Sequence, residues 1–199
     1  MTGRSTRSAC EEPPSGVRHF PMCNLRLLKS RWWATVTCNQ RLQEDVMEQG
    51  IIEREIFIEA TPEVVFEVVS SPEHLKGWWP DDADYEARPG SEGTITFGDC
   101  SAGGKVVQFA VVDARPPRTF SFRWTHPAGE PPTAGNSLLV TFELTPSGGG
   151  TLLRMTETGF RERGWSQAIA EQEYREHVHG WGIFLPRLAP YVATLQVQP

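Results

Sequence analysis

Glu173 and His177 are the pair of residues in this sequence whose types and spacing best suit acid–base chemistry. They are four positions apart, so on a helix they share one face, and Trp181 follows on the same line. If that face looks into a cavity, the carboxylate could orient the imidazole as a general base near neutral pH. The alternative is an exposed pair on a solvated helix, because Arg175 and Glu176 lie close by.

The other polar clusters lack the spacing of a metal or phosphate site. Asp81, Asp82 and Asp84 form a short acidic run without the glycine and distal glutamate of a calcium loop, so we expect a solvated loop. The four cysteines include no CxxC pair, which favours reduced thiols in a cytosolic protein over a zinc site. No glycine-rich phosphate loop, nucleophile elbow or HExxH pair occurs. We therefore predict no metal and no cofactor.

A strand and two short helices are predicted first, followed by a series of strands. Residues 51–60 are rich in β-branched residues and partly alternate, as expected of a strand. Thr61-Pro62 and Ser71-Pro72 each combine an N-cap residue with proline at the first helical position. Six further strand-like runs, separated by turn residues, cover approximately 83–88, 93–98, 105–114, 118–125, 137–145 and 151–158. Short strands joined locally favour an antiparallel meander.

A long C-terminal helix is expected to cover one face of this sheet. In the strand predicted at 118–125, the aromatic residues at alternate positions share one face, which must be covered. The segment 167–195 carries apolar residues at helical spacing, and Gly180, Gly182 and Pro186 predict a kink or a weak turn within it. One helix cannot fill a curved seven-stranded sheet, so we expect a cavity between helix and sheet.

Two arginines in the predicted strands, Arg123 and Arg154, have two alternative roles. By alternation, Arg123 points away from the aromatic face. Either arginine could bind an acidic group of a ligand. Otherwise each is an outward side chain paired with Glu143 or Glu157.

Length and charge suit one acidic domain with a tail. The chain has 199 residues, 39% hydrophobic and 22% charged, close to the averages of soluble globular proteins. Seven of 19 basic and four of 25 acidic residues fall in 1–46, so that segment is net +3 and residues 47–199 are net −9. An acidic domain disfavours nucleic acid and anionic membrane surfaces, and no apolar run is long enough to span a bilayer.

The first 46 residues are expected to be largely disordered. Residues 1–21 are rich in Ser, Arg, Pro and Gly and show no periodicity. The basic and apolar stretch 25–33 leaves open a membrane-surface helix or a transit peptide. We predict an N-terminal extension over 1–46 and one domain over 47–199.

Four segments carry a resemblance to a known family. They are residues 58–66 with Ala60-Thr61-Pro62, residues 71–80 with Trp78-Trp79-Pro80, residues 113–124 with Pro116-Pro117-Arg118, and Gly180-Trp181 followed by Leu185, Arg187-Leu188 and Tyr191-Val192. Over roughly 50–195 the chain resembles the START-like, or SRPBCC, superfamily. Within it, the resemblance is to the group named after the activator of heat-shock protein 90 ATPase.

The resemblance implies an α+β helix-grip (Bet v 1-like) fold. In this fold a curved antiparallel sheet wraps around a long C-terminal helix, and two short helices follow the first strand. It also implies a cavity between sheet and helix that takes hydrophobic small molecules. Residues expected to line it are Trp78, Trp79, Phe97, Phe109, Phe122, Trp124, Phe142, His177 and Trp181. Trp78 and Trp79 could instead plug the core.

Three functions follow as hypotheses. The first is a cytoplasmic protein that binds a hydrophobic or aromatic small molecule. The second is an enzyme of the polyketide cyclase or aromatase type, with Glu173 and His177 as its acid–base pair. The third is a protein-interaction module with a co-chaperone-like role, which would have a filled core and an exposed apolar patch. The first predicts a small molecule as partner, with no nucleic acid and no membrane insertion, and the third a chaperone.

Overall fold

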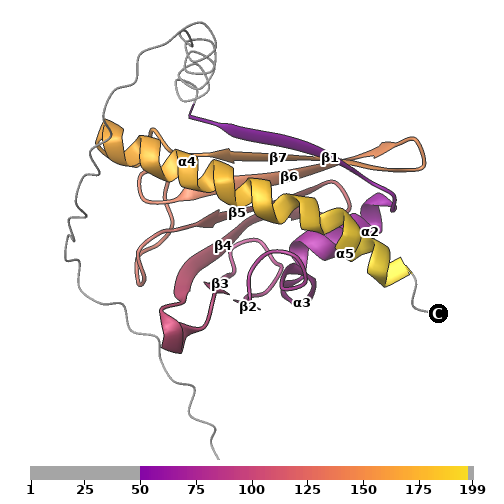
Figure 1. Ribbon diagram of the computed structural model, residues 1–199, viewed down its shortest axis with the longest axis horizontal. Coiled ribbons are helices and arrows are strands. Elements are labelled where there is room, and N and C mark those ends of the chain that lie inside the picture. The colour runs from indigo at the N-terminus through magenta and orange to yellow at the C-terminus, as the bar shows by residue number, and fades with distance from the viewer. Residues whose placement is uncertain (1–49, 197–199) are drawn as a thin grey trace, which may run out of the picture. The chain divides into compact units, whose positions relative to one another are not determined.

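The computed structural model describes residues 50–196, which form a seven-stranded antiparallel sheet with helices across one face (Figure 1). By its contacts the chain divides into Met1–Gln43 and Glu44–Pro199, and the described residues belong to the second unit. The disorder predicted for 1–46 lies outside the described residues. No helix within 50–196 has both the length and the apolar character needed to cross a bilayer.

The strands form an antiparallel meander, as predicted. They are β1 (Ile52–Ile58), β2 (Asp82–Asp84), β3 (Glu92–Phe97), β4 (Lys105–Arg115), β5 (Thr119–Trp124), β6 (Leu138–Ser147) and β7 (Gly150–Thr158). Their order in the sheet is β1-β7-β6-β5-β4-β3-β2, so only β1 is out of chain order, at the edge beside β7. The run predicted at 83–88 is replaced by the short strand β2, Asp82–Asp84, which overlaps it only at residues 83 and 84.

The helices are α2 (Pro62–Ser70), α3 (Pro72–Leu75), α4 (Gln167–Phe184) and α5 (Leu188–Gln196), with 3-10 turns at η1 (Cys100–Ala102) and η2 (Leu185–Arg187). Both predicted helix starts are confirmed, with proline in the first turn of each helix. Thr61 and Ser71 occupy the N-cap positions, but neither side chain makes a capping hydrogen bond. The helix-grip architecture predicted from the sequence is therefore confirmed.

The C-terminal helix bends at only one of the predicted positions. Helix α4 continues through Gly180 and Gly182, so the prediction of a kink there is wrong. The interruption lies at Pro186, inside η2, because proline has no backbone N–H to continue the α-helical pattern. A Cβ added at either glycine would meet no atom within 4 Å, so neither residue is required by close packing.

Helix α4 crosses the sheet (Figure 1), and few of its residues are buried. Of its 18 residues, Tyr174 and Trp181 alone are buried. The Tyr174 hydroxyl donates a hydrogen bond to the carbonyl of Ile51 at 3.1 Å, which holds the helix near β1. Much of the space between α4 and the sheet is therefore filled by side chains from other elements.

Gly77 is a position where close packing does require glycine. A Cβ at Gly77 would lie 2.1 Å from the ring of Tyr191 on α5, whose hydroxyl is 3.1 Å from Nδ1 of His74. We expect Gly77→Ala to lower the free energy of unfolding by about 1–3 kcal/mol, as overpacked sites do. Urea unfolding measures the change, with Gly180→Ala as the control, since that position has open space. Equal stability of the two variants would contradict this account of the contact.

Candidate functional site

An aromatic cluster fills the space between the sheet and α4. It contains all nine residues predicted to line a cavity: Trp78, Trp79, Phe97, Phe109, Phe122, Trp124, Phe142, His177 and Trp181. Seven of them are buried, while Phe97 and His177 are partly buried. The structure thus brings these nine side chains together in the place that the sequence predicted. Their contact with a ligand stays a prediction.

Trp79 lies at the centre of this aromatic cluster. Its ring centroid is 4.9 Å from that of Trp181, 5.2 Å from that of Trp124 and 5.9 Å from that of Phe97. Its indole N–H makes no hydrogen bond to a described residue, whereas Trp78 donates to the carbonyl of Val68 at 3.4 Å. Packing against other rings is therefore what holds the Trp79 side chain in the cluster.

Two hollows on the surface of residues 50–196 lie outside the aromatic cluster. One, of about 510 Å³, lies between α2 and α5 and is lined by residues that include Val64, Val68 and Leu195. Another, of about 580 Å³, is lined by residues between Asp84 and Thr94. Neither is lined by a member of the aromatic cluster. These two hollows thus do not coincide with the cavity predicted between sheet and helix, where the rings of the aromatic cluster pack against one another.

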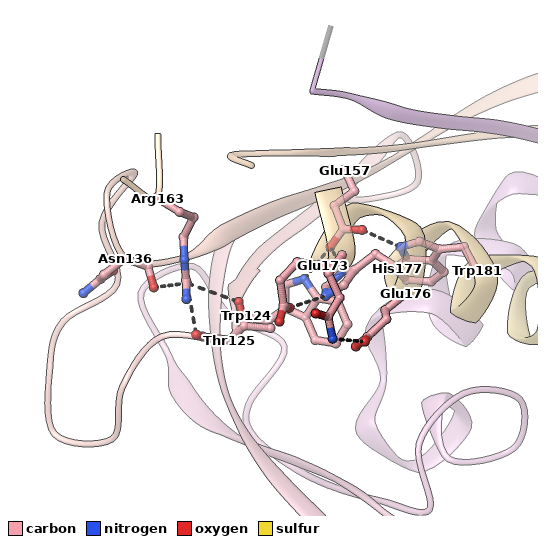
Figure 2. A network of polar contacts seen from close by, with 10 residues as sticks. Trp124, Thr125, Asn136, Glu157, Arg163, Glu173, Glu176, His177 and Trp181 are labelled. Atoms are coloured by element: carbon pink, nitrogen blue, oxygen red, sulfur yellow. Dashed lines mark hydrogen bonds and ion pairs between the residues drawn. The ribbon is translucent and has the colours of Figure 1, made fainter. Parts of the chain in front are cut away.

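A buried carboxylate, that of Glu157, lies within the aromatic cluster (Figure 2). Its Oε1 accepts a hydrogen bond from the indole N–H of Trp124 at 2.8 Å and lies 2.9 Å from Nδ1 of His177. Its Oε2 accepts from the indole N–H of Trp181 at 2.7 Å. Glu157 follows the buried Met155 by two positions on β7, so strand alternation turns it inward. The three contacts offset the unfavourable burial of a charged group.

His177 stands between two carboxylates. Its Nδ1 faces Glu157, and its Nε2 is 4.0 Å from Oε2 of Glu173. The imidazole is 12% exposed and its ring packs edge-on against Trp124 and Phe160. The predicted Glu173–His177 pair thus forms, but Glu157 is the closer partner. A buried acceptor at Nδ1 fixes the orientation of the ring, which is the arrangement that a general base needs.

The inward position of Glu157 contradicts one prediction from the sequence. The strand arginines were expected to pair outward with Glu143 or Glu157, and the Glu157 alternative is wrong. The Glu143 alternative is confirmed for Arg154, which pairs with Glu143 at 3.9 Å and also with Glu53 at 2.8 Å. Arg123 donates to the hydroxyl of Ser137 at 3.2 Å. Alternation along β7 was the signal that could have placed Glu157 inside.

Arg163 lies near Glu173, but its guanidinium binds loop residues. Its Nη1 donates to the carbonyl of Thr125 at 3.1 Å and to the carbonyl of Asn136 (Figure 2). Its guanidinium also lies 4.4 Å over the ring of Trp165. Burial lowers the pKa of Arg163, and the charge of Glu173 acts in the opposite direction. The Arg163 guanidinium is thus held by backbone carbonyls, and among residues 50–196 it forms no ion pair with Glu157.

The acidic run at the start of β2 is occupied by local contacts. Oδ2 of Asp81 accepts the backbone N–H of Gly98 at 2.6 Å, and Asp82 pairs with Lys76 at 3.7 Å. Within residues 50–196, no group of three or more His, Cys, Asp or Glu side chains is arranged to hold a metal ion.

His126 predicts a dependence of stability on pH. The residue is 6% exposed, and its Nδ1 has no hydrogen-bond partner among the described residues. Burial lowers the pKa of His126, an effect to which Arg163 adds and which Glu92 opposes. Below the unfolded pKa of about 6.5, the unfolded chain therefore binds more protons than the folded one, so stability falls as the pH drops.

We expect the urea midpoint of the protein to fall between pH 7.5 and pH 5.5, and His126→Asn to reduce that fall. Full stability is retained above the unfolded pKa and is lost as the pH drops through the folded pKa. Urea unfolding at four or five pH values measures the effect. An equal fall in both proteins would assign the dependence to other groups.

Comparison with known proteins identifies the family. Residues 59–193 match the family described as "Activator of Hsp90 ATPase homolog 1-like protein". The chain belongs to this family. A comparison with curated proteins finds no significant match.

Solved structures of similar proteins agree with the fold. Protein MLL2253 from Mesorhizobium loti is 22% identical with a TM-score of 0.57, over 75% of this chain and 99% of that one. Protein NE0264 from Nitrosomonas europaea is 16% identical with a TM-score of 0.59, over 74% and 97%. A protein from Colwellia psychrerythraea, solved in solution as an Aha1 dimer, is 24% identical with a TM-score of 0.51, over 71% and 95%. At these identities the likeness concerns the fold.

Proposed function

We propose that this protein binds a flat, apolar small molecule between the sheet and α4, with a ring of the ligand taking the place of the Trp79 side chain. The observation that carries the proposal is the position of Trp79, central in the aromatic cluster and held there by ring contacts. Trp79 precedes Pro80 within the segment between α3 and β2. A rotation of its side chain therefore need not disturb the hydrogen bonds of the sheet.

A series of ring contacts between the surface and Trp79 supports the proposal. Phe97 on β3 and Phe184 at the end of α4 are both partly buried, and their ring centroids are 6.0 Å apart. Phe97 also contacts Trp79. The aromatic cluster thus extends from Trp79 to a partly exposed pair of rings, through which a ligand would enter.

The free energy lost when the Trp79 side chain leaves the aromatic cluster is comparable to that gained when a ligand ring takes its place. A large aromatic side chain buries about 150–250 Å², which corresponds to about 4–6 kcal/mol by area. A ligand ring in the same position restores contacts to Trp124 and Trp181 that Trp79 gives up. Net affinity then comes from the rest of the ligand and from the new contacts of the displaced indole.

Two measurements on the full chain test this function. Native mass spectrometry of protein purified from its own organism, followed by release of bound compounds, should find a stoichiometric apolar ligand. A titration with naphthalen-1-ylmethanol, followed by tryptophan fluorescence, should saturate at one equivalent, because the ring enters among three indoles. Protein that carries no ligand and does not bind this probe would overturn the proposal. It would favour the protein-interaction module, the third function predicted from the sequence.

A cavity enzyme is a second candidate, favoured by the position of His177 between Glu157 and Glu173. It rests on the short Nδ1 contact to a buried carboxylate, which leaves Nε2 directed toward Glu173. Once the ligand is identified, His177→Ala should abolish its conversion while leaving affinity nearly intact. Unchanged turnover in that variant would remove His177 from the chemistry.

A further inference from the structure

We infer that the ligand of this protein carries a protonated basic nitrogen, which binds at the carboxylate of Glu157. This inference rests on the proposed function and specifies the chemical class of its ligand. It is carried by three features of the aromatic cluster: the charge balance at Glu157, its remaining acceptor capacity and the rings around it.

The charge of Glu157 has no permanent counterion. Among residues 50–196, no lysine or arginine forms an ion pair with it, and His177 is its partner, charged only when protonated. The Arg163 guanidinium donates instead to the carbonyls of Thr125 and Asn136. A buried carboxylate without a fixed positive partner is a strong attractor for a cation that can reach it.

The carboxylate has room for one more donor. Two oxygens of a carboxylate offer about four acceptor positions. Oε1 has two donors, from Trp124 and His177, whereas Oε2 has one, from Trp181. An ammonium N–H of the ligand would fill the second position on Oε2, and charge-assisted hydrogen bonds are the stronger kind.

The rings around this position also favour a cation. The Trp79 ring contacts those of Trp124 and Trp181, and both of those indoles donate to Glu157. A ligand in place of Trp79 therefore lies next to two indoles that contact the carboxylate directly. Tryptophan is the best of the aromatic side chains at binding cations over its face.

The negative charge around the aromatic cluster also favours a cationic ligand. Glu173 and Glu176 lie close to His177 on α4 (Figure 2). Residues 47–199 carry a net charge of −9. An acidic domain attracts cations to its surface and repels anions, which raises the local concentration of a basic ligand.

A set of three naphthalene compounds of nearly equal shape tests the inference. They are naphthalen-1-ylmethanamine, which is a cation at pH 7, neutral naphthalen-1-ylmethanol and anionic naphthalene-1-carboxylate. We expect the amine to bind the full chain at least about tenfold more tightly than the alcohol. We expect the carboxylate to bind most weakly. Equal affinity of amine and alcohol would overturn the inference but leave the proposed function standing, while no binding of any compound would overturn both.

Variants separate the buried carboxylate from the acidic surface. Glu157→Gln keeps the shape and one acceptor, so it should lose the preference for the amine and keep its affinity for the alcohol. Glu53→Gln removes an exposed acid on β1 and should keep the preference. A preference that persists in Glu157→Gln would show attraction to the surface alone, and the inference would be wrong.

The salt dependence of ligand binding tests the inference on the unsubstituted protein, so it does not depend on the folding of any variant. Buried ion pairs are screened much less than exposed ones. In the unsubstituted protein, the preference for the amine should therefore survive about 0.5 M NaCl. Its loss at that salt concentration would also contradict binding at Glu157.

Discussion

Replacing Glu157 with alanine should lower the free energy of unfolding by about 3–5 kcal/mol, the range seen when one member of a buried polar or charged group is removed. The substitution leaves the indole N–H groups of Trp124 and Trp181 buried without an acceptor. Each unsatisfied donor costs about 1–3 kcal/mol, and the loss of the side chain leaves a void as well. The contact that orients His177 is lost too.

Urea unfolding of the variant gives the size of this effect, and the matched control is Arg154→Ala on the same strand. Arg154 faces outward and pairs with Glu53 at the surface, where an ion pair contributes about 0–1 kcal/mol. Glu157→Gln should fall between the two, because an amide oxygen still accepts a hydrogen bond. A loss below about 1 kcal/mol in Glu157→Ala would show that the two indoles find other acceptors.

The same contacts explain why α4 stays on the sheet. Helix α4 buries few of its own residues, yet two of its side chains, His177 and Trp181, meet the single carboxylate of Glu157 on β7. Tyr174 supplies a further hydrogen bond near β1. These hydrogen bonds hold α4 on the sheet although few of the helix's own residues are buried.

The sheet and helices could be predicted because their signals are local. Alternation along β5 and the prolines at the starts of α2 and α3 each involve a few neighbouring residues, and the structure agrees with them. The kink expected at Gly180 and Gly182 failed for a physical reason. Glycine weakens a helix without ending it, whereas Pro186 removes a hydrogen-bond donor.

The site was harder to predict because its decisive features depend on packing. The residue types and spacings brought the nine aromatic-cluster residues to one place, but the volume between sheet and helix does not follow from them. Trp79 could therefore be expected either as a wall of the cavity or as a plug in the core. Glu157 was overlooked because an acidic residue on a strand is usually exposed, and its three donors come from β5 and α4, far away in the sequence.

Trp79→Ala should make the protein less stable and at the same time a better binder. Removing a buried tryptophan costs about 3–5 kcal/mol of unfolding free energy, because contacts are lost and a cavity remains. That cavity lies beside Trp124 and Trp181, where the proposed ligand binds. The variant no longer has to displace its own side chain, so its affinity for naphthalen-1-ylmethanol should rise about tenfold or more.

A second variant, with a void elsewhere in the core, distinguishes binding in the space left by Trp79 from a general loss of packing. Phe120 is fully buried and packs against Phe66 and Phe122, outside the immediate contacts of Trp79. Phe120→Ala should lose a similar amount of stability, about 3–5 kcal/mol, without any gain in affinity. Fluorescence titration and urea unfolding of both variants give the comparison. If Trp79→Ala binds no better than the unsubstituted protein, the indole is a structural plug, and ligand exchange at this position is ruled out as the function of the aromatic cluster.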